Sequence, residues 1–217
     1  MEILLISATS GEIAPLLERL PLNTPHIRIS SLITGAGMIP TTWQLAGRLH
    51  TARPDLVIHA GIGGSFKQEY PLGSVVELTR DCFADTGAKD KDGRFLSMFE
   101  LGLWQKDEFP FQGGWLPIPI ISGIPETGLP RVSGITVNTV NGLQADIDAA
   151  IQAYNPDIET MEAAAVIYAC LLAGIPVRSI RSVSNYVEPR NRAAWNIPLA
   201  VGRLNDFLIQ YLERFSP

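Results

Sequence analysis

The sequence predicts a single α/β domain in which a central, mixed and twisted β-sheet is flanked by helices. Three observations lead to this prediction. Short β-branched and aliphatic runs alternate with longer segments of helical periodicity along the chain. A length of 217 residues, 46% of them hydrophobic, suits one sizeable core. Neither an internal repeat nor a low-complexity tract divides the chain, so we expect one domain over residues 1–217.

The first part of the chain alternates strands with helices. Short runs rich in Ile, Leu and Val predict strands over residues 3–6, 27–33 and 55–59. Between these runs, apolar residues recur at helical spacing, which predicts helices over residues 12–20 and 41–50. This order is typical of an α/β sheet.

The second part continues with the same two patterns, interrupted by one long irregular segment. Residues 109–130 are dense in Pro and Gly and cannot hold a long helix, so they predict an extended surface loop, and such loops often cover a site. The remaining predictions are strands over residues 75–79, 135–140 and 177–183, and helices over residues 142–154, 161–173 and 193–215.

Composition argues against several classes of function. The net charge is −5 and the Lys and Arg residues are scattered, so no basic face for a nucleic acid is expected. No apolar run reaches the roughly 20 residues of a membrane helix, and the first seven residues lack the basic start of a signal peptide. We therefore expect a cytoplasmic protein without membrane contact. Cys82 and Cys170 have no metal-ligand spacing, so two buried free thiols and no metal are expected.

A first glycine cluster, Thr34-Gly35-Ala36-Gly37-Met38-Ile39-Pro40, looks like half of a dinucleotide-binding fingerprint. Three features argue against a nicotinamide cofactor. The cluster does not follow the first strand, Pro40 replaces the third glycine, and the next strand ends at His59 rather than at an acidic residue. The sequence therefore favours a tight turn in which Pro40 enters the next helix, and no cofactor.

A second glycine cluster, Ala60-Gly61-Ile62-Gly63-Gly64-Ser65, comes directly after a buried strand. Because glycines let the backbone approach a ligand closely, amides around Ile62 and Gly63 are candidates to contact a sugar, a phosphate or a purine. A tight turn from strand to loop with no ligand is the structural alternative.

Two polar groups are expected to converge at one edge of the sheet. Glu162 lies at the start of an apolar helix, and Ser184 with Asn185 ends the next strand, which is where α/β sheets usually bind ligands. This pattern predicts a ribose-binding carboxylate beside a purine-reading amide. Structural alternatives remain for each residue: Glu162 as an acid favoured by the helix dipole, Met161 as helix core, and Asn185 as a turn or cap residue.

The motifs also occur in a familiar order. The chain resembles the nucleoside phosphorylase and nucleosidase superfamily through Ser7-Ala8-Thr9-Ser10-Gly11-Glu12, Gly61-Ile62-Gly63-Gly64, Thr139-Val140-Asn141-Gly142, Met161-Glu162-Ala163 and Ser184-Asn185. Within this superfamily it is most similar to the futalosine hydrolases, bacterial enzymes of an alternative menaquinone pathway, partly through Ala84-Asp85-Thr86-Gly87-Ala88-Lys89-Asp90. The resemblance implies a nucleoside phosphorylase-like fold.

The resemblance implies roles that suit the sugar end of a nucleoside. Glu162 would accept hydrogen bonds from the ribose 2′ and 3′ hydroxyls and favour an oxocarbenium-like sugar, with Met161 packed against the ribose. Related phosphorylases carry a Gly-Asp-Pro-type turn with arginines for phosphate, and this chain has neither arginine position. Related nucleosidases use a glutamate where Glu12 stands, as a general base for water. The structural alternative for Glu12 is an acid that opens the first helix.

At the base end, the resemblance sets Asn185 where methylthioadenosine nucleosidases have an aspartate. An amide can donate to a 6-oxo group or N7, so Asn185, oriented by Ser184, favours hypoxanthine over adenine. Thr139 and Val140 would border the base. The substrate carboxylate needs a cation or amide donors, with candidates at Lys89, Lys91, Arg94, Arg190 and Arg192. The candidates for an apolar wall or a dimer contact are Phe95, Phe99, Trp104 and Trp195.

Together these inferences predict an N-ribosyl hydrolase that needs neither metal nor cofactor, takes a small nucleoside, futalosine, and releases hypoxanthine. A methylthioadenosine-type nucleosidase or a purine nucleoside phosphorylase is the alternative of the same class. A catalytically inactive nucleoside-binding module is the alternative outside enzymes, because a fold does not guarantee activity. The resemblance further implies a homo-oligomer, either a homodimer or a dimer of dimers.

Overall fold

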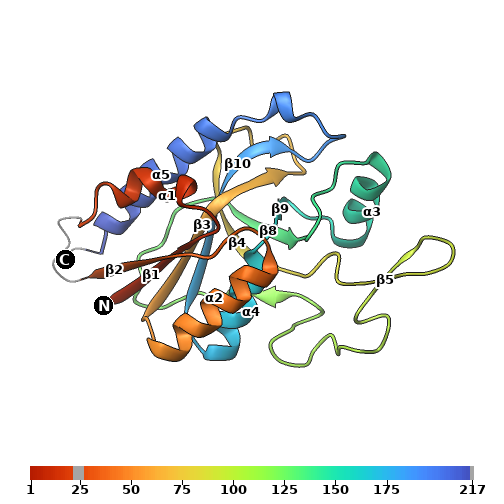
Figure 1. Cartoon of the computed structure of the whole chain (residues 1–217), viewed down its shortest axis with the longest axis horizontal. Coiled ribbons are helices and arrows are strands. Elements are labelled where there is room, and N and C mark those ends of the chain that lie inside the picture. Colours follow the sequence, from red (N-terminus) through yellow and green to blue (C-terminus); the bar gives the residue numbers. More distant parts are fainter. Residues whose placement is uncertain (22–26, 216–217) are drawn as a thin grey trace.

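A computed structural model describes residues 1–21 and 27–215, which form a single mixed α/β unit (Figure 1). Its main sheet has the strand order β10-β4-β8-β9-β3-β1-β2, and β10 also pairs with β3. The strands therefore close a circuit through β3, β10, β4, β8 and β9, with β1 and β2 extending from β3. The bounds are β1 Glu2–Ser7, β2 Arg28–Ile33, β3 Leu56–Ser65, β4 Val75–Asp81, β8 Arg131–Thr136, β9 Ile158–Thr160 and β10 Val177–Tyr186.

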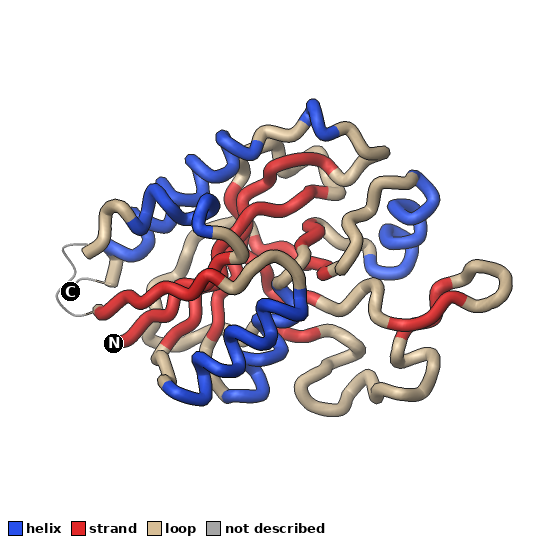
Figure 2. The backbone as a smooth tube through the Cα atoms, viewed as in Figure 1, coloured by secondary structure: helices blue, strands red, loops and turns tan. Residues whose placement is uncertain are grey.

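Helices cover this sheet in two pairs (Figure 2). Helix α1 (Ser10–Leu17) packs against α5 (Ile197–Glu213), and α2 (Met38–Thr51) packs against α4 (Ala163–Ala173). Residues of α4 are apolar on nearly every side, as expected for a helix between the sheet and another helix. The smaller elements are β5 (Gly87–Lys89), β6 (Phe95–Ser97), β7 (Leu116–Pro117), α3 (Gln144–Tyr154) and the 3-10 turn Arg192–Ala194.

The two sides of the sheet carry separate cores because strand side chains alternate between faces. In β1, Leu4 and Ile6 belong to the cluster that also contains residues of α4. Ile3 and Leu5 belong to the cluster formed with α1 and α5. A strand buried on both faces reads as a continuous apolar run, which is why the sequence predicts β1 well.

The structure corrects three of the predicted elements. The strand expected at residues 135–140 is β8, Arg131–Thr136, and residues 137–143 form a loop instead. The C-terminal helix expected from residue 193 begins at Ile197, after the 3-10 turn, where the Asn196 side chain accepts a hydrogen bond from the Leu199 N–H. The strand expected at residues 55–59 is β3, Leu56–Ser65, which runs through the second glycine cluster, so the alternative of a tight turn there is wrong.

Strand β9 was missed in the sequence, and its presence explains the glycines of β3. A Cβ on Gly63 would lie 2.9 Å from the Glu159 carbonyl oxygen, so β9 can approach β3 this closely only because a glycine stands there. The Pro- and Gly-rich segment at residues 109–130 holds no helix, as predicted, and contains the short β7. No helix in the described ranges is both long and apolar enough to cross a membrane.

Candidate active site

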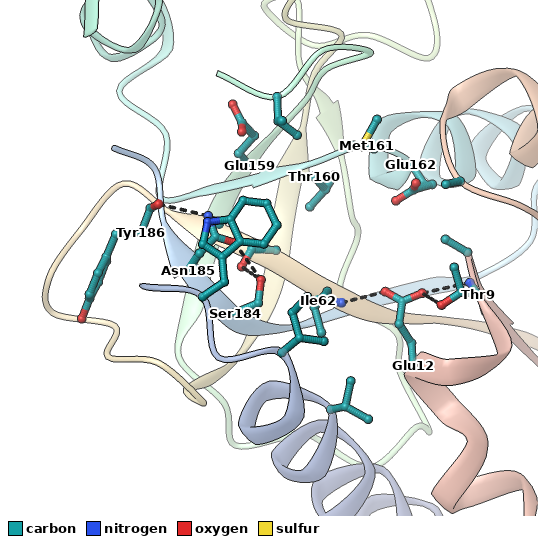
Figure 3. A pocket seen from close by; sticks show the side chains of 18 of the residues that line it. Thr9, Glu12, Ile62, Glu159, Thr160, Met161, Glu162, Ser184, Asn185 and Tyr186 are labelled. Atoms are coloured by element: carbon teal, nitrogen blue, oxygen red, sulfur yellow. Dashed lines mark hydrogen bonds between the residues drawn. The ribbon is translucent and has the colours of Figure 1, made fainter. Parts of the chain in front are cut away.

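A cavity of about 450 Å³ opens where β3, β9 and β10 end beside the N-termini of α1 and α4 (Figure 3). Eight of the nine site residues predicted from the sequence line it: Glu12, Ile62, Gly63, Val140, Met161, Glu162, Ser184 and Asn185. Thr139 does not line this cavity, and its backbone N–H donates to Asp85 at 3.2 Å. Residues far apart in sequence thus meet in one site.

Glu12 connects the first helix to the glycine cluster of β3. Its Oε2 accepts the Thr9 N–H at 2.9 Å and forms a capping box at the start of α1. Its Oε1 accepts the Ile62 N–H at 3.1 Å. A Cβ on Gly61 would lie 2.9 Å from this oxygen, so Gly61 leaves the space that the carboxylate occupies. The two functions considered for Glu12, helix capping and a place in the cavity, therefore coexist.

Glu162 is the N-cap residue of α4 and lies in the same part of the cavity as Glu12. Its Oε1 accepts the Gly37 N–H at 2.7 Å, from a glycine with φ of 92° at the start of α2. The first glycine cluster therefore makes the tight turn that the sequence predicts and also presents an amide to the site. Burial raises the pKa of Glu162 and the nearby Glu12 adds to the rise, while the Gly37 amide and Arg181 oppose it.

A fully buried cation lies behind these two carboxylates. Arg181 in β10 donates from Nη1 to the His59 carbonyl at 3.1 Å and to the Ile180 carbonyl at 2.8 Å. Its charge interacts favourably with both Glu162 and Glu12. Burial and this neighbouring cation lower the pKa of His59, so that its imidazole is neutral. This end of the cavity therefore holds two carboxylates whose charge is opposed by one buried arginine.

Ser184 and Asn185 lie at a β-bulge near the end of β10, where the pairing with β3 shifts register. The Ser184 hydroxyl donates to the Asn185 Oδ1 at 2.8 Å, and the Asn185 Nδ2 donates to the Tyr186 carbonyl at 3.0 Å. Because an amide nitrogen carries two hydrogens, one N–H of Asn185 remains for a ligand. The serine therefore fixes which atom of the amide donates.

The loop at residues 137–143 is held by a carboxylate on each side. Asp85 accepts the backbone N–H groups of Asn138 and Thr139, and Glu159 accepts both the backbone and the side-chain N–H of Asn141. Glu159 lines the cavity and is 6% exposed. Burial raises its pKa to about 7, and the charge of Asp85 contributes to the rise.

The outer end of the cavity is formed by residues that follow β10, and Arg190 and Trp195 both line it. The Arg190 guanidinium lies 5.8 Å from the Trp195 ring centroid. Among the candidates for binding a substrate carboxylate, Arg190 thus lies in the site. Lys89 and Arg94 belong to the β5–β6 hairpin, where Arg94 pairs with Glu100 at 2.7 Å, and neither they nor Lys91 and Arg192 line the cavity.

The other expected wall residues lie elsewhere. Phe99 and Trp104 pack in an edge-on arrangement with ring centroids 5.7 Å apart, beside Phe111, in the core that contains α4. The long segment at residues 109–130 supplies Phe111 to this core and no residue to the cavity lining, so it does not cover the site. Within the described residues, no three His, Cys, Asp or Glu side chains converge as metal ligands.

Sequence reasoning gave no role to Glu159 and Asn141, which line the cavity, or to Arg181, whose buried charge acts on Glu12 and Glu162. Glu159 lies three residues before Glu162, but its position in the cavity depends on β9, which is too short to leave a periodic pattern. Arg181 was visible only as a charge in an apolar strand, a combination that indicates a paired or functional group. Asn141 was quoted as part of a motif without a role.

Comparison with known proteins places these features in a family. The chain matches the phosphorylase superfamily over residues 2–213. A futalosine hydrolase of Streptomyces coelicolor is 38% identical over 169 residues, which cover 75% of this chain and 68% of that protein. A futalosine hydrolase of Acidothermus cellulolyticus is 30% identical over 220 residues, which cover 93% of this chain and 86% of that protein.

Solved structures share the fold. A 5′-methylthioadenosine/S-adenosylhomocysteine nucleosidase of Colwellia psychrerythraea, in complex with adenine, has a TM-score of 0.78 at 16% identity and covers 99% of this chain and 96% of its own. Futalosine hydrolase of Helicobacter pylori has a TM-score of 0.77 at 14% identity and covers 99% and 98%. At such low identities the structural likeness supports the fold alone.

Proposed function

This chain belongs to the phosphorylase superfamily and, within it, to the futalosine hydrolases, and we propose that it hydrolyses the N-glycosidic bond of futalosine. Hypoxanthine and dehypoxanthine futalosine are the products of this reaction, which serves the alternative route to menaquinone. The observation that carries the proposal is the pair Glu12 and Glu162 at one end of a cavity whose other end holds the Ser184-oriented amide of Asn185.

Water is the proposed nucleophile because the sugar end suits an anion poorly. Two carboxylates line it, and Arg181 is fully buried and bonded to two backbone carbonyls and the His59 ring. In the described lining, Arg190 is the only arginine, and it belongs to the outer end. A phosphate needs fixed cations, and two carboxylates would repel it. The charge distribution therefore favours hydrolysis over phosphorolysis.

We propose the following division of roles in the reaction. The C1′–N9 bond breaks and its electron pair leaves with the base, while Glu162 holds the ribose hydroxyls and favours the cationic sugar. Glu12 takes a proton from water, and the water oxygen bonds to C1′. The free N–H of Asn185 stabilises charge on the departing purine, which then takes a proton from solvent, and Glu12 returns its proton to solvent. Met161 packs against the ribose, and Ile62, Gly63 and Val140 border the substrate.

The proposal includes a place for the substrate's carboxylate. Arg190 lines the outer end of the cavity, beside Trp195, which offers an apolar ring to an aromatic acid. A guanidinium can hold a carboxylate with two parallel hydrogen bonds. Of the five cations considered from the sequence, Arg190 is therefore our choice.

We propose a cytoplasmic homo-oligomer, a homodimer or a dimer of dimers. Two exposed apolar side chains on α2 support self-association, since Ile39 is 81% exposed and Trp43 is 79% exposed. Both follow the turn whose Gly37 amide holds Glu162, so an interface there would adjoin the sugar end of the site.

The decisive experiment measures base release from futalosine, inosine and methylthioadenosine, with and without phosphate. We expect futalosine to release hypoxanthine in phosphate-free buffer and to leave a free sugar rather than a sugar 1-phosphate. A strict requirement for phosphate would rule out a hydrolase. Preference for methylthioadenosine would favour the adenine-type nucleosidase, and binding without release of any base would favour a nucleoside-binding module.

A further inference from the structure

Glu159 is a carboxylate in the cavity for which the proposed reaction has no use. It lies with Asn185 toward one side of the site, away from Glu12 and Glu162 (Figure 3). At 6% exposure it has little access to water, and no cation forms an ion pair with it among the described residues. A buried carboxylate without a cation needs hydrogen-bond donors.

The protein supplies only some of those donors. Glu159 Oε2 accepts a hydrogen bond from the Asn141 side-chain amide. The Asn141 backbone N–H is shared between the two carboxylate oxygens, at 3.2 Å from Oε1 and 3.3 Å from Oε2. A carboxylate offers about four acceptor positions, so Oε1 can still accept a strong hydrogen bond. A donor on the ligand would fill that position.

Strand pairing sets Glu159 and Asn185 on either side of one glycine. Gly64 of β3 pairs with Glu159 of β9 and, on its other edge, with Asn185 of β10. Paired residues of neighbouring strands point to the same face, and two strand spacings separate the two residues by roughly 10 Å. A Cβ on Gly64 would lie 3.0 Å from the Asn185 Nδ2, so the glycine leaves room for this amide, and Gly64, Glu159 and Asn185 all line the cavity.

A planar base fits between one acceptor and one donor in this arrangement. Hypoxanthine has a donor at N1–H and acceptors at O6 and N7. Adenine has an acceptor at N1 and a donor at its 6-amino group. Glu159 accepts and the free Asn185 N–H donates, so the pair matches hypoxanthine, whereas adenine would set its N1 lone pair against the carboxylate.

We propose that Glu159 is a specificity-determining residue that accepts the N1–H of a 6-oxopurine while Asn185 donates to the opposite edge of the base. The inference rests on the proposed function for its choice of substrate, but it concerns recognition of the base and not the hydrolytic step. A hydrogen bond from Asn185 to N7 would not separate the two purines, since N7 is an acceptor in both, so the discrimination falls to Glu159 at N1.

The test measures binding of free hypoxanthine and adenine by calorimetry at about pH 8.5, where Glu159 is ionised. Wild type is expected to bind hypoxanthine more tightly than adenine. In Glu159→Met the N1–H loses its charged acceptor, so hypoxanthine affinity should fall by roughly tenfold to a hundredfold while adenine affinity changes little. Glu159→Gln, which can still accept from Asn141, should lose the preference too and covers the case in which the Met variant does not fold.

Asp85→Asn is the matched control, because Asp85 holds the same loop through Asn138 and Thr139 but does not line the cavity. A loosened loop should weaken the binding of both bases alike. Equal losses of hypoxanthine and adenine affinity in the Glu159 variants would therefore mean that Glu159 only anchors the loop, and would overturn the inference. Base binding needs no hydrolysis: a Glu159-dependent hypoxanthine preference without futalosine cleavage would overturn only the proposed substrate. Futalosine cleavage with an unchanged preference in Glu159→Met would overturn only the role of Glu159.

Discussion

At the scale of single residues, the base end of the site depends on one unused hydrogen. The Asn185 amide is held at its oxygen by Ser184 and at its nitrogen by the Tyr186 carbonyl, which leaves one N–H for the purine. In Asn185→Asp this donor becomes an acceptor that faces O6 or N7 of hypoxanthine. Catalytic efficiency on futalosine should fall roughly tenfold to a hundredfold, since an unsatisfied buried group costs about 1–3 kcal/mol.

Catalytic efficiency on the 6-amino counterpart of futalosine should fall less in the same variant, because the 6-amino group of adenine can donate to the new carboxylate. The measurement is the ratio of kcat/KM for futalosine and its 6-amino counterpart in wild type and variant. Asn191→Asp adds the same charge on the exposed loop outside the cavity lining and should leave the ratio unchanged. An equal ratio in wild type and Asn185→Asp would mean that Asn185 does not read the 6-position.

Glu12 is the residue on which the choice of water as nucleophile depends. Glu12→Gln should lower kcat on futalosine by about 10²–10⁴, the usual range for losing a general base, with a smaller change in KM. Glu162→Gln should damage both constants, because Glu162 is proposed to hold the ribose before and during bond cleavage. Glu18→Gln, an exposed change at the other end of α1, is the control. Near-normal turnover of Glu12→Gln would move water activation to another group.

The raised pKa of Glu159 predicts a pH-dependent choice of base. Below about pH 7 its carboxyl is protonated and can donate to the adenine N1; above that pH it is ionised and accepts the hypoxanthine N1–H. The preference for the 6-oxo substrate should therefore increase as the pH rises through about 7. The other charged groups near it are Asp85 behind the loop, Glu162 after β9, and Glu188 and Arg190 after β10.

Kinetics on futalosine and its 6-amino counterpart across this pH range provide the check. In Glu159→Gln, position 159 no longer titrates, so its contribution to the change of substrate preference with pH should vanish. If the substrate preference of that variant changed with pH as much as in wild type, one of the neighbouring charged groups would be responsible for the titration.

At the scale of elements, the sequence predicts those helices and strands whose burial is periodic or continuous. Strand β1 and helix α4 are of this kind. The sequence also predicts that Glu162 and Asn185 line one cavity, because Glu162 lies at the start of a helix and Asn185 near the end of a strand. Strand β9 has three residues and shows no period. It pairs with β8 along its whole length and with the end of β3 at Gly64 and Ser65, and local pattern cannot reveal such long-range contacts.

Gly63 is where this long-range contact can be tested. A Cβ in Gly63→Ala would lie 2.9 Å from the Glu159 carbonyl and 3.0 Å from Ile158 Cγ2, so β3 and β9 must separate. Overpacking of this kind costs about 1–3 kcal/mol of unfolding free energy, and we expect reduced activity because Glu159 and Glu162 move with β9. Gly202→Ala in α5, where a Cβ meets nothing within 4 Å, should be neutral or stabilising. Chemical denaturation compares the two; equal stabilities would contradict the close packing.

At the scale of the whole molecule, the closed strand circuit explains why the site lies where it does. Strands β3, β9 and β10 contribute neighbouring residues at one rim, so carboxylate, glycine and amide align across three strands. The order of motifs in the sequence suffices to indicate the family and hence this fold. Pattern alone gives neither the closure between β3 and β9 nor the burial of Arg181, since both depend on contacts between distant segments.

Assembly is the remaining whole-molecule property, and it is open to a direct test at α2. Burying Ile39 and Trp43 would remove two large, exposed apolar side chains from water, which favours self-association. We expect light scattering to give a dimer or larger oligomer for wild type and a monomer for the double change Ile39→Glu with Trp43→Glu, because charges in an apolar interface are costly. Activity should fall with dissociation, since Gly37 at the start of α2 holds Glu162. Ile120→Glu, an equally large change at an exposed residue outside α2, should retain both assembly and turnover. A wild-type monomer that is fully active would contradict the proposed oligomer, and the exposed face of α2 would then need another explanation.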